Sequence, residues 1–412
     1  MQKLAKNFIL ALTIFPVLSH AAESEDSILS FGAFGTLGVI HSDEDKADFS
    51  GTSLYFDGVG YSKSLTADVD SLVGGQVTAD FNDRLSAVIQ LVSKRNPKGD
   101  YDPHVEWANI RYEFTPELSV RAGRSVLSTF MASTYRNVGY ATPWVRPPIE
   151  LYELVPITFR DGISVNYSTS LEHIANSLEV TYGGSETELP DGDTLDVDEN
   201  WGISNTFQIG DLSIHASYQH ATPNLDAYDN LINGFRNFGT AGQNIAARYD
   251  PNDKILKYVG LGASYDPGLW FLMAEWGRTQ TDSILGKKSA AYISGGRRYG
   301  RLTPYITLAR SRREAYPANS TLDLNTLPAP LAQEAGALNE ALLSLQASSA
   351  PIQDSISLGL RWEVNHQIAF TAQFDHSNML KGSQGNLENL QPGFKPGGSL
   401  NLISASLSFI FP

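Results

Sequence analysis

Residues 401–411 read Asn-Leu-Ile-Ser-Ala-Ser-Leu-Ser-Phe-Ile-Phe, and no other stretch of the chain says as much about its architecture. Successive side chains of an extended strand point to opposite faces. One face is apolar and ends in aromatic residues, and it consists of Ile403, Ala405, Leu407, Phe409 and Phe411. The other face carries the hydroxyl groups of Ser404, Ser406 and Ser408. This period of two is typical of a strand in the wall of a transmembrane barrel.

The N-terminal residues have the pattern of an export signal. Lys3 and Lys6 precede an apolar run over 8–18, and a small-x-small cleavage site ends at Ala21. The apolar run is shorter than the roughly 20 residues of a membrane-spanning helix. We therefore expect residues 1–21 to be a cleaved signal peptide and residues 22–412 to form one barrel domain.

Composition narrows the class of protein further. The 412 residues include no cysteine and have a formal net charge of -15, so disulfides do not hold the chain together and nucleic acid is not an expected partner. The mean hydropathy of -0.19 resembles that of a soluble protein. Barrel strands that alternate apolar and polar residues also average to such a value, so the composition does not exclude a barrel.

Short alternating segments recur along the whole chain and predict an all-β fold. We count sixteen candidate strands, at 31–40, 72–82, 84–94, 104–114, 118–124, 159–169, 176–183, 201–209, 212–220, 258–265, 269–278, 289–298, 301–310, 354–363, 367–375 and 400–411. Aromatic residues gather near strand ends, as in interfacial girdles: Phe81, Phe114, Tyr182, Tyr218, Tyr265, Trp270, Trp362 and Phe411.

The connections between these segments alternate in length. Short turns follow every even-numbered strand, and long polar connections follow every odd-numbered one. A meander across a membrane predicts this alternation, with short periplasmic turns and long external loops, whereas a Greek-key sandwich does not. Sixteen strands also leave a water-filled lumen, which eight would not. The prediction is a 16-stranded antiparallel transmembrane β-barrel with both termini on the periplasmic side.

Two connections carry patterns of their own. In 331–345, leucine and alanine recur at spacings of three and four, which predicts a helix. It is interpreted as a helix packing within the seventh external loop, with a partner-binding or pore-capping helix as the alternative. The segment 125–158 is rich in apolar, aromatic and proline residues. Such a segment must pack against something, and the inner wall is the surface that a wide barrel offers.

At this segment the chain resembles a known family, the general Gram-negative porins. The resemblance rests on the signal peptide, the strand count, the aromatic last strand, Arg-Ala-Gly-Arg at 121–124, and Tyr-Ala-Thr-Pro-Trp-Val-Arg-Pro-Pro at 140–148. The last of these is similar to a porin-like subgroup of environmental proteobacteria. The resemblance implies a trimeric outer-membrane channel whose long third loop folds into the lumen and sets its narrowest point. The chain departs from the family in ending on Pro412 after Phe411.

The candidate pore-lining residues follow from the resemblance and from strand parity. The resemblance implies acidic lining from Glu150, Glu153 and Asp161. Parity and proximity to the third loop give the arginines, which are Arg111, Arg121, Arg124, Arg136, Arg146, Arg160, Arg298 and Arg361. A ring of fixed charge in a pore selects ions. The alternative for any one arginine is that it pairs with a carboxylate and pins the third loop.

Sites of other kinds are not predicted. The acidic stretches Asp43–Asp48 and Asp191–Glu199 lack the glycine and glutamate positions of an EF-hand, and they are interpreted as solvated external loops. The chain has no His-Glu-x-x-His or Gly-x-Ser-x-Gly motif, so we expect neither an enzyme nor a bound metal or cofactor.

The sequence therefore favours a porin in the outer membrane that lets small hydrophilic solutes and ions diffuse passively. Its expected partners are outer-membrane lipid, lipopolysaccharide and two further copies of itself. A substrate-selective channel for anionic solutes is one alternative. A structural or adhesive barrel that acts through its external loops is another.

Overall fold

A computed structural model describes residues 27–189, 192–316, 321–348 and 351–411 of the chain. The predicted signal peptide and Pro412 lie outside these residues. Within them the chain is mostly β-structure, and all sixteen predicted strands are present, most of them longer than predicted. The confirmed ring consists of β1 (Leu29–Ser42), β5 (Leu72–Asn82), β6 (Leu85–Lys94), β7 (His104–Glu113), β8 (Leu118–Val126), β9 (Phe159–Leu171), β10 (Ile174–Glu188), β11 (Thr194–Ile209), β12 (Leu212–Leu225), β13 (Leu256–Tyr265), β14 (Trp270–Gln280), β15 (Lys287–Arg297), β16 (Leu302–Arg313), β17 (Gln353–Glu363), β18 (Ile368–Met379) and β19 (Ser399–Phe411).

The ring is antiparallel and closed. Each strand pairs with its neighbour in sequence, and β1 pairs with β5 on one side and with β19 on the other. Closure matters in a bilayer because an open sheet edge would leave backbone groups without hydrogen-bond partners in hydrocarbon. Three two-residue strands, β2 (Asp48–Phe49), β3 (Val59–Gly60) and β4 (Leu65–Thr66), lie in the connection between β1 and β5.

Burial follows the predicted parity of the strands. In β19, Ser404, Ser406 and Ser408 are buried, while Ile403 and Phe411 are exposed. The other strands repeat this pattern, so the apolar face of the ring points outward. An exposed apolar surface of this kind marks the lipid-facing side of a transmembrane barrel. Most of the predicted girdle aromatics are exposed in the same way, among them Phe81, Phe114, Trp270 and Trp362.

Most connections alternate in length as predicted, and two of the odd-numbered ones are shorter than expected. The residues between 183 and 201 were expected to form a long loop. Instead, β10 and β11 continue pairing past a bulge at Gly183/Ser185, which leaves only 189–193 between them. The β11–β12 ladder likewise continues past an irregularity at Asp198/Trp201. The connection between β14 and β15 is likewise only 281–286.

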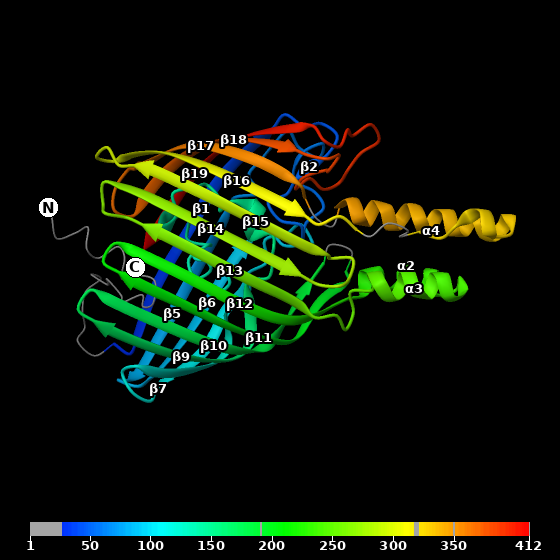
Figure 1. Ribbon diagram of the computed structural model, residues 1–412. Coiled ribbons are helices and arrows are strands. Elements are labelled where there is room, and N and C mark those ends of the chain that lie inside the picture. The colour runs from blue at the N-terminus through cyan, green and yellow to red at the C-terminus, as the bar shows by residue number, and fades with distance from the viewer. Residues whose placement is uncertain (1–26, 190–191, 317–320, 349–350, 412) are drawn as a thin grey trace.

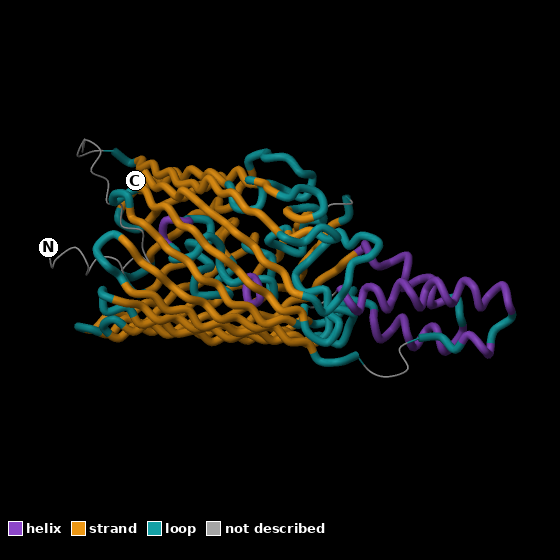
Figure 2. Tube along the Cα trace, turned by 90° about the horizontal axis from the view of Figure 1, so that it is seen from above, coloured by secondary structure: helices purple, strands orange, loops and turns teal. Residues whose placement is uncertain are grey.

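Three helices form a projection beyond the end of the barrel that lies away from the termini (Figures 1 and 2). They are α2 (Asp229–Arg236) and α3 (Gly239–Tyr249), from the β12–β13 connection, and α4 (Ala329–Ser348), from the β16–β17 connection. The predicted helix is therefore confirmed, but it does not pack within its own loop alone. It shares a hydrophobic core with α2 and α3 that includes Phe235, Ile245 and Leu342. Two single 3-10 turns, η4 (Asp226–Tyr228) and η5 (Leu324–Thr326), accompany these helices.

None of the helices in the described residues is long and apolar enough to cross a membrane.

Candidate functional site

The third loop, residues 127–158 between β8 and β9, lies against the inward-facing side chains of the barrel. Met131 donates its backbone N–H to the Glu275 carboxylate on β14 at 2.8 Å. The indole Nε1 of Trp144 lies 3.0 Å from the hydroxyls of both Ser294 on β15 and Thr307 on β16. The loop holds the 3-10 turn η3 (Gly139–Ala141) and the short helix α1 (Ile149–Tyr152), and Figure 2 shows short helical turns within the ring of strands.

Aromatic packing joins the third loop to this wall. The buried cluster contains Phe130, Trp144, Leu151 and Tyr152 of the loop with Tyr258, Phe271, Tyr292 and Tyr305 of the wall. Phe130 stacks on Tyr152 with ring centres 4.5 Å apart, and Trp144 meets Tyr292 edge-on at 5.6 Å. Buried aromatic pairs of this kind add stability beyond the area that they bury. The loop and the wall therefore share one core.

Arg361 of β17 holds the tip of the third loop. Its guanidinium donates to the carbonyl oxygens of Thr142 at 2.9 Å and Tyr140 at 2.7 Å, and it lies 5.0 Å from the centre of the Tyr140 ring. The side chain is only 7% exposed. Arg361 therefore faces the loop, and its donors are occupied by loop carbonyl groups.

Arg146 holds the middle of the loop to three other segments. It binds Asp70 of the β1–β5 connection bidentately, at 2.8 and 2.6 Å. It also donates to Asp375 of β18 at 3.1 Å and to the Ser404 hydroxyl of β19 at 2.6 Å. Arginine favours such pairing because its planar guanidinium matches the two oxygens of a carboxylate. Arg146 thus attaches the third loop to these three segments.

The two glutamates of the third loop, Glu150 and Glu153, also accept hydrogen bonds from other segments. Glu150 is buried and accepts from Gln353 at 2.7 Å and from Ser355 at 2.6 Å, both on β17. Glu153 accepts from the backbone N–H of Ser53 at 2.7 Å and from its hydroxyl at 2.9 Å. Burial raises the pKa of the Glu153 carboxyl, and the Ser53 hydrogen bonds partly offset this effect. The structure gives both side chains a role in attaching the loop.

Arg124 and Asp161 do not face the lumen, and their assignment as pore lining is wrong. They pair directly across β8 and β9, on the same side of the sheet as the exposed Ile163 and Val165. Their bidentate ion pair, at 2.8 and 2.6 Å, is therefore on the outside of the barrel. The third loop lies between these two residues in the sequence, so nearness to the loop did not indicate side-chain direction.

Arg298 and Arg160 bind residues outside the third loop. Arg298 binds Asp266 bidentately, at 2.6 and 2.7 Å, in the short turn between β13 and β14. It lies at the end of the barrel away from the long loops, so it cannot take part in a constriction with the third loop. Arg160 faces inward but is 2% exposed, and it donates to Asn200 and, at 2.9 Å, to Gln219.

Three predicted arginines remain with accessible side chains. Arg111 of β7 and Arg121 of β8 are opposite each other in the ladder, and about a third of each side chain is exposed. Their carboxylate contacts are Glu113, at 2.9 Å, and Glu179, at the longer distance of 3.8 Å. Arg136 lies on the loop, with its guanidinium 5.7 Å from the centre of the Tyr152 ring.

The positions of these strands define two sides of the lumen. In a closed ring of sixteen, β7 and β8 are eight strands from β15 and β16 and so lie opposite them. We call the inner face of β14–β19 the covered wall, because the third loop is bonded to it. We call the inner face of β5–β9 the facing wall. Arg111 and Arg121 are on the facing wall, across from the loop.

Sequence reasoning missed several charged residues that belong to this arrangement. Lys94 shares the inward parity of Gln90 on β6, and Glu179 is inward on β10, so parity could have identified both. Asp70 had no such signal, because it belongs to an irregular connection. Asp48 was interpreted as part of a solvated loop, and this is wrong. It is fully buried, and it accepts from Ser62 at 2.8 and 2.5 Å.

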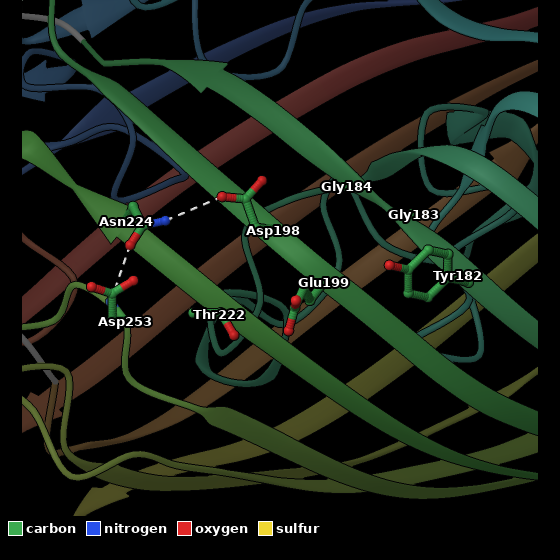
Figure 3. A pocket seen from close by; sticks show the side chains of 8 residues that line it. All are labelled: Tyr182, Gly183, Gly184, Asp198, Glu199, Thr222, Asn224 and Asp253. Atoms are coloured by element: carbon green, nitrogen blue, oxygen red, sulfur yellow. Dashed lines mark hydrogen bonds between the residues drawn. The ribbon is translucent and has the colours of Figure 1, made fainter.

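A separate pocket of about 520 Å³ lies between the long-loop ends of β10, β11 and β12 (Figure 3). Its lining includes Asp198, Glu199, Asn224 and Asp253. Asn224 links two of these carboxylate residues, because it donates to Asp198 at 3.3 Å and accepts from the backbone N–H of Asp253 at 3.1 Å. Thr222 and Asn224 have the outward parity of β12, so the pocket opens on the outside of the barrel.

No protein-family model matches the sequence, and a search of curated proteins finds no match. Solved structures do match over nearly the whole chain. The anion-selective porin from Comamonas acidovorans is 13% identical, with a TM-score of 0.53, and the match covers 93% of this chain and 100% of that one. Salmonella typhi OmpF in complex with daunomycin is 12% identical, with a TM-score of 0.53 and coverage of 93% and 97%. Outer-membrane-expressed OmpT of Vibrio cholerae is 11% identical, with a TM-score of 0.52 and coverage of 94% and 99%.

At these identities the likeness concerns architecture and not solute or selectivity. The closed sixteen-stranded ring, its outward apolar face and these matches agree with one another. The chain has the fold of the Gram-negative outer-membrane porins.

Proposed function

We propose that this protein is an outer-membrane channel through which small hydrophilic solutes and ions diffuse passively. The observation that carries the proposal is the difference between the two sides of the lumen. The third loop is bonded to the covered wall, while accessible polar and charged side chains such as Arg111 and Arg121 line the facing wall. A sixteen-stranded ring is wide enough to leave an aqueous path between them.

The third loop is the proposed constriction of this path. It takes up space beside the covered wall, and its accessible side chains include Arg136, which has intermediate exposure. Under this proposal the narrowest point lies between the loop and the facing wall. The protein is proposed as a channel and not as an enzyme, and diffusion involves no covalent step.

Conductance in planar lipid bilayers tests this proposal. The purified barrel is expected to insert in discrete steps whose size grows in proportion to salt concentration. Heat-modifiable electrophoretic mobility of the same sample confirms that the barrel is folded. A folded barrel that inserts without any conductance step would refute the channel.

A second candidate is a channel selective for anionic solutes. It is favoured by Arg111, Arg121 and Arg136, whose side chains are accessible and are not held by a bidentate carboxylate. The Comamonas acidovorans structure is described as an anion-selective porin, which is consistent with this candidate. Reversal potentials across a potassium chloride gradient decide it, because a preference for potassium over chloride would exclude it.

A structural or adhesive barrel is the candidate from another class. The helical projection formed by α2, α3 and α4 favours it, since this projection has a core of its own outside the lumen. Replacing residues 226–255 and 321–348 with short glycine-serine linkers would separate the two functions. An unchanged conductance with lost surface binding would support the adhesive role of the projection.

We also propose a homotrimer. One solved OmpT structure from Vibrio cholerae is described as a trimer form, and this chain has the same architecture over 93% of its length. Chemical cross-linking in outer-membrane vesicles is expected to give a three-copy species, and a monomer as the largest species would contradict it.

A further inference from the structure

The connection between β1 and β5 contains a hairpin at the long-loop end of the barrel (Figure 1). β2 and β3 pair at the base of this hairpin, where Phe49 is opposite Val59. Both side chains are buried in a hydrophobic cluster that includes Leu400 and Leu402 of β19. The base is therefore fixed to the wall of the barrel. The tip, residues 52–57, extends beyond the base, and we call it the strap.

One end of the strap is bonded to the third loop. Ser53 donates its backbone N–H to the Glu153 carboxylate at 2.7 Å and its hydroxyl to the same oxygen at 2.9 Å. The Thr52 hydroxyl is 3.3 Å from that oxygen. Glu153 directly follows α1, so these contacts join the strap to the helical part of the third loop.

The other end of the strap is bonded to the facing wall. Arg95 directly follows β6 and is 7% exposed. It donates to the backbone carbonyl of Asp57 at 2.8 Å and also to the Asp57 carboxylate. The Tyr55 hydroxyl donates to the backbone carbonyl of Arg95 at 2.7 Å. The strap is therefore held at the long-loop end of β6.

The strap thus crosses the space between the third loop and the facing wall. Ser53 and Asp57 are four residues apart, and four extended residues span at most about 14 Å. Burial raises the pKa of the Tyr55 phenol to about 12, and the charges of Arg95 and Glu153 also act on it. The two anchors are therefore close enough for both to influence one side chain of the strap.

Several strap side chains are accessible despite these contacts. Ser53, Phe56 and Asp57 are exposed, and Phe56 is 53% exposed. The buried base and the exposed tip therefore differ in role. The base packs against the barrel wall, whereas the tip presents side chains to the solution at the mouth of the lumen.

We propose that the strap is a second constriction of the channel, on the long-loop side of the third loop, and that it limits the size and charge of the solutes that enter. This inference rests on the proposed channel function. The third loop narrows the path from the covered wall, and the strap narrows it by bridging from that loop to β6. Solutes then pass beside the strap before they reach Arg136 on the loop and Arg111 and Arg121 on the facing wall.

Cysteine labelling tests whether the strap borders the path, and the absence of cysteine from the sequence makes the labelling specific. Phe56→Cys is studied in planar bilayers and treated with a negatively or a positively charged methanethiosulfonate reagent. Both labels are expected to lower single-channel conductance. The reversal potential in a salt gradient should shift toward cation preference with the negative label and toward anion preference with the positive one.

The matched control for labelling is Leu343→Cys on α4. Leu343 is 51% exposed, close to the value for Phe56, but it lies on the helical projection. Its labels are expected to leave conductance and reversal potential unchanged. A conducting Phe56→Cys barrel that is labelled without any change would overturn the strap and leave the channel intact, and equal changes at both positions would also overturn it. A parent without conductance would refute the channel and the strap together.

Releasing one anchor gives a second measurement. Arg95→Gln frees the facing-wall end of the strap while Ser53 stays bonded to Glu153. Larger sugars are expected to enter liposomes faster than with the parent. Lys98→Gln is the control, because Lys98 belongs to the same connection but pairs with Glu188. An unchanged size limit in folded Arg95→Gln would contradict the proposal, and labelling of Phe56→Cys decides it if that variant does not fold.

Discussion

The covered wall and the facing wall of the lumen carry the same kind of residue for different purposes. On the covered wall Arg361 is 7% exposed, and its donors are taken by loop carbonyl groups. On the facing wall Arg121 is 34% exposed, and its nearest carboxylate oxygen is 3.8 Å away. Both side chains point inward from a strand. What distinguishes them is whether the third loop lies over them.

This difference separates the arginines that attach the third loop from those that can influence which ions pass. A guanidinium that is saturated with hydrogen bonds has little effect on passing ions, because its charge is offset locally and water is excluded around it. An accessible guanidinium contributes its field to the path of the solute. Changing a covered arginine should therefore alter the width of the pore, and changing a facing arginine should alter which ions pass.

The largest effect is expected from Arg146→Ala. Its removal leaves Asp70 and Asp375 as neighbouring carboxylates with little exposure and no shared cation. Breaking a buried ion pair in this way costs about 3–5 kcal/mol. We expect the third loop to detach from the covered wall and single-channel conductance to increase in planar bilayers.

The control for this prediction is Arg146→Ala combined with Asp70→Asn and Asp375→Asn. This triple variant removes the uncompensated charges but does not restore the attachment. Its thermal stability should recover in part while its conductance stays high. If Arg146→Ala folds and conducts like the parent, Arg146 does not hold the loop.

Arg361→Gln is expected to have a smaller effect of the same kind. Each hydrogen bond from a charged group contributes about 1.5–3 kcal/mol, and the glutamine can replace only part of this network. Only the tip around Tyr140 and Thr142 should loosen, because Arg146 still holds the middle of the loop. Liposome swelling with sugars of increasing size measures the outcome: larger sugars should enter faster than in the parent. An unchanged size limit would contradict the role of Arg361.

The matching change on the facing wall is Arg111→Gln with Arg121→Gln. This pair should leave conductance within about twofold, since neither side chain holds the loop. It should shift the permeability ratio toward cations, because Glu113 and Glu179 then lose their cationic neighbours. The reversal potential in a salt gradient measures this, and the shift should shrink at high salt as screening increases. A large conductance change without a selectivity change would reverse the roles assigned to the two walls.

The sequence was sufficient to predict the barrel, but it did not predict which inward-facing arginines attach the third loop and which remain accessible. Alternation of polar and apolar residues is a local property, and it identified every strand of the sixteen-stranded ring, including β19 with its buried serines. Arg146 and Asp70 are 76 positions apart and meet only because two irregular connections fold against each other. No periodicity records such a contact. Arg124 is a different case, because the parity of β8 places it outside, with Val120 and Ala122, and only its nearness to the third loop in the sequence suggested otherwise.

The smallest expected effect concerns the external end of the third loop, where Glu388 of the β18–β19 connection lies near Glu153. Burial, and then the charge of Glu153, raises the pKa of the Glu388 carboxyl from 4.5 to about 8. The folded chain therefore retains a proton that the unfolded chain releases, and stability falls as pH rises from about 4.5 to 8. Glu388→Gln removes this penalty, so its thermal midpoint should exceed that of the parent at pH 9 and match it at pH 4. Because Glu388 is partly exposed, we expect a gain of only about 1 kcal/mol, or roughly 1–3 °C. The exposed Glu340→Gln on α4 is the matched control, and an equal gain there would mean that net charge, and not contact with the loop, sets the effect.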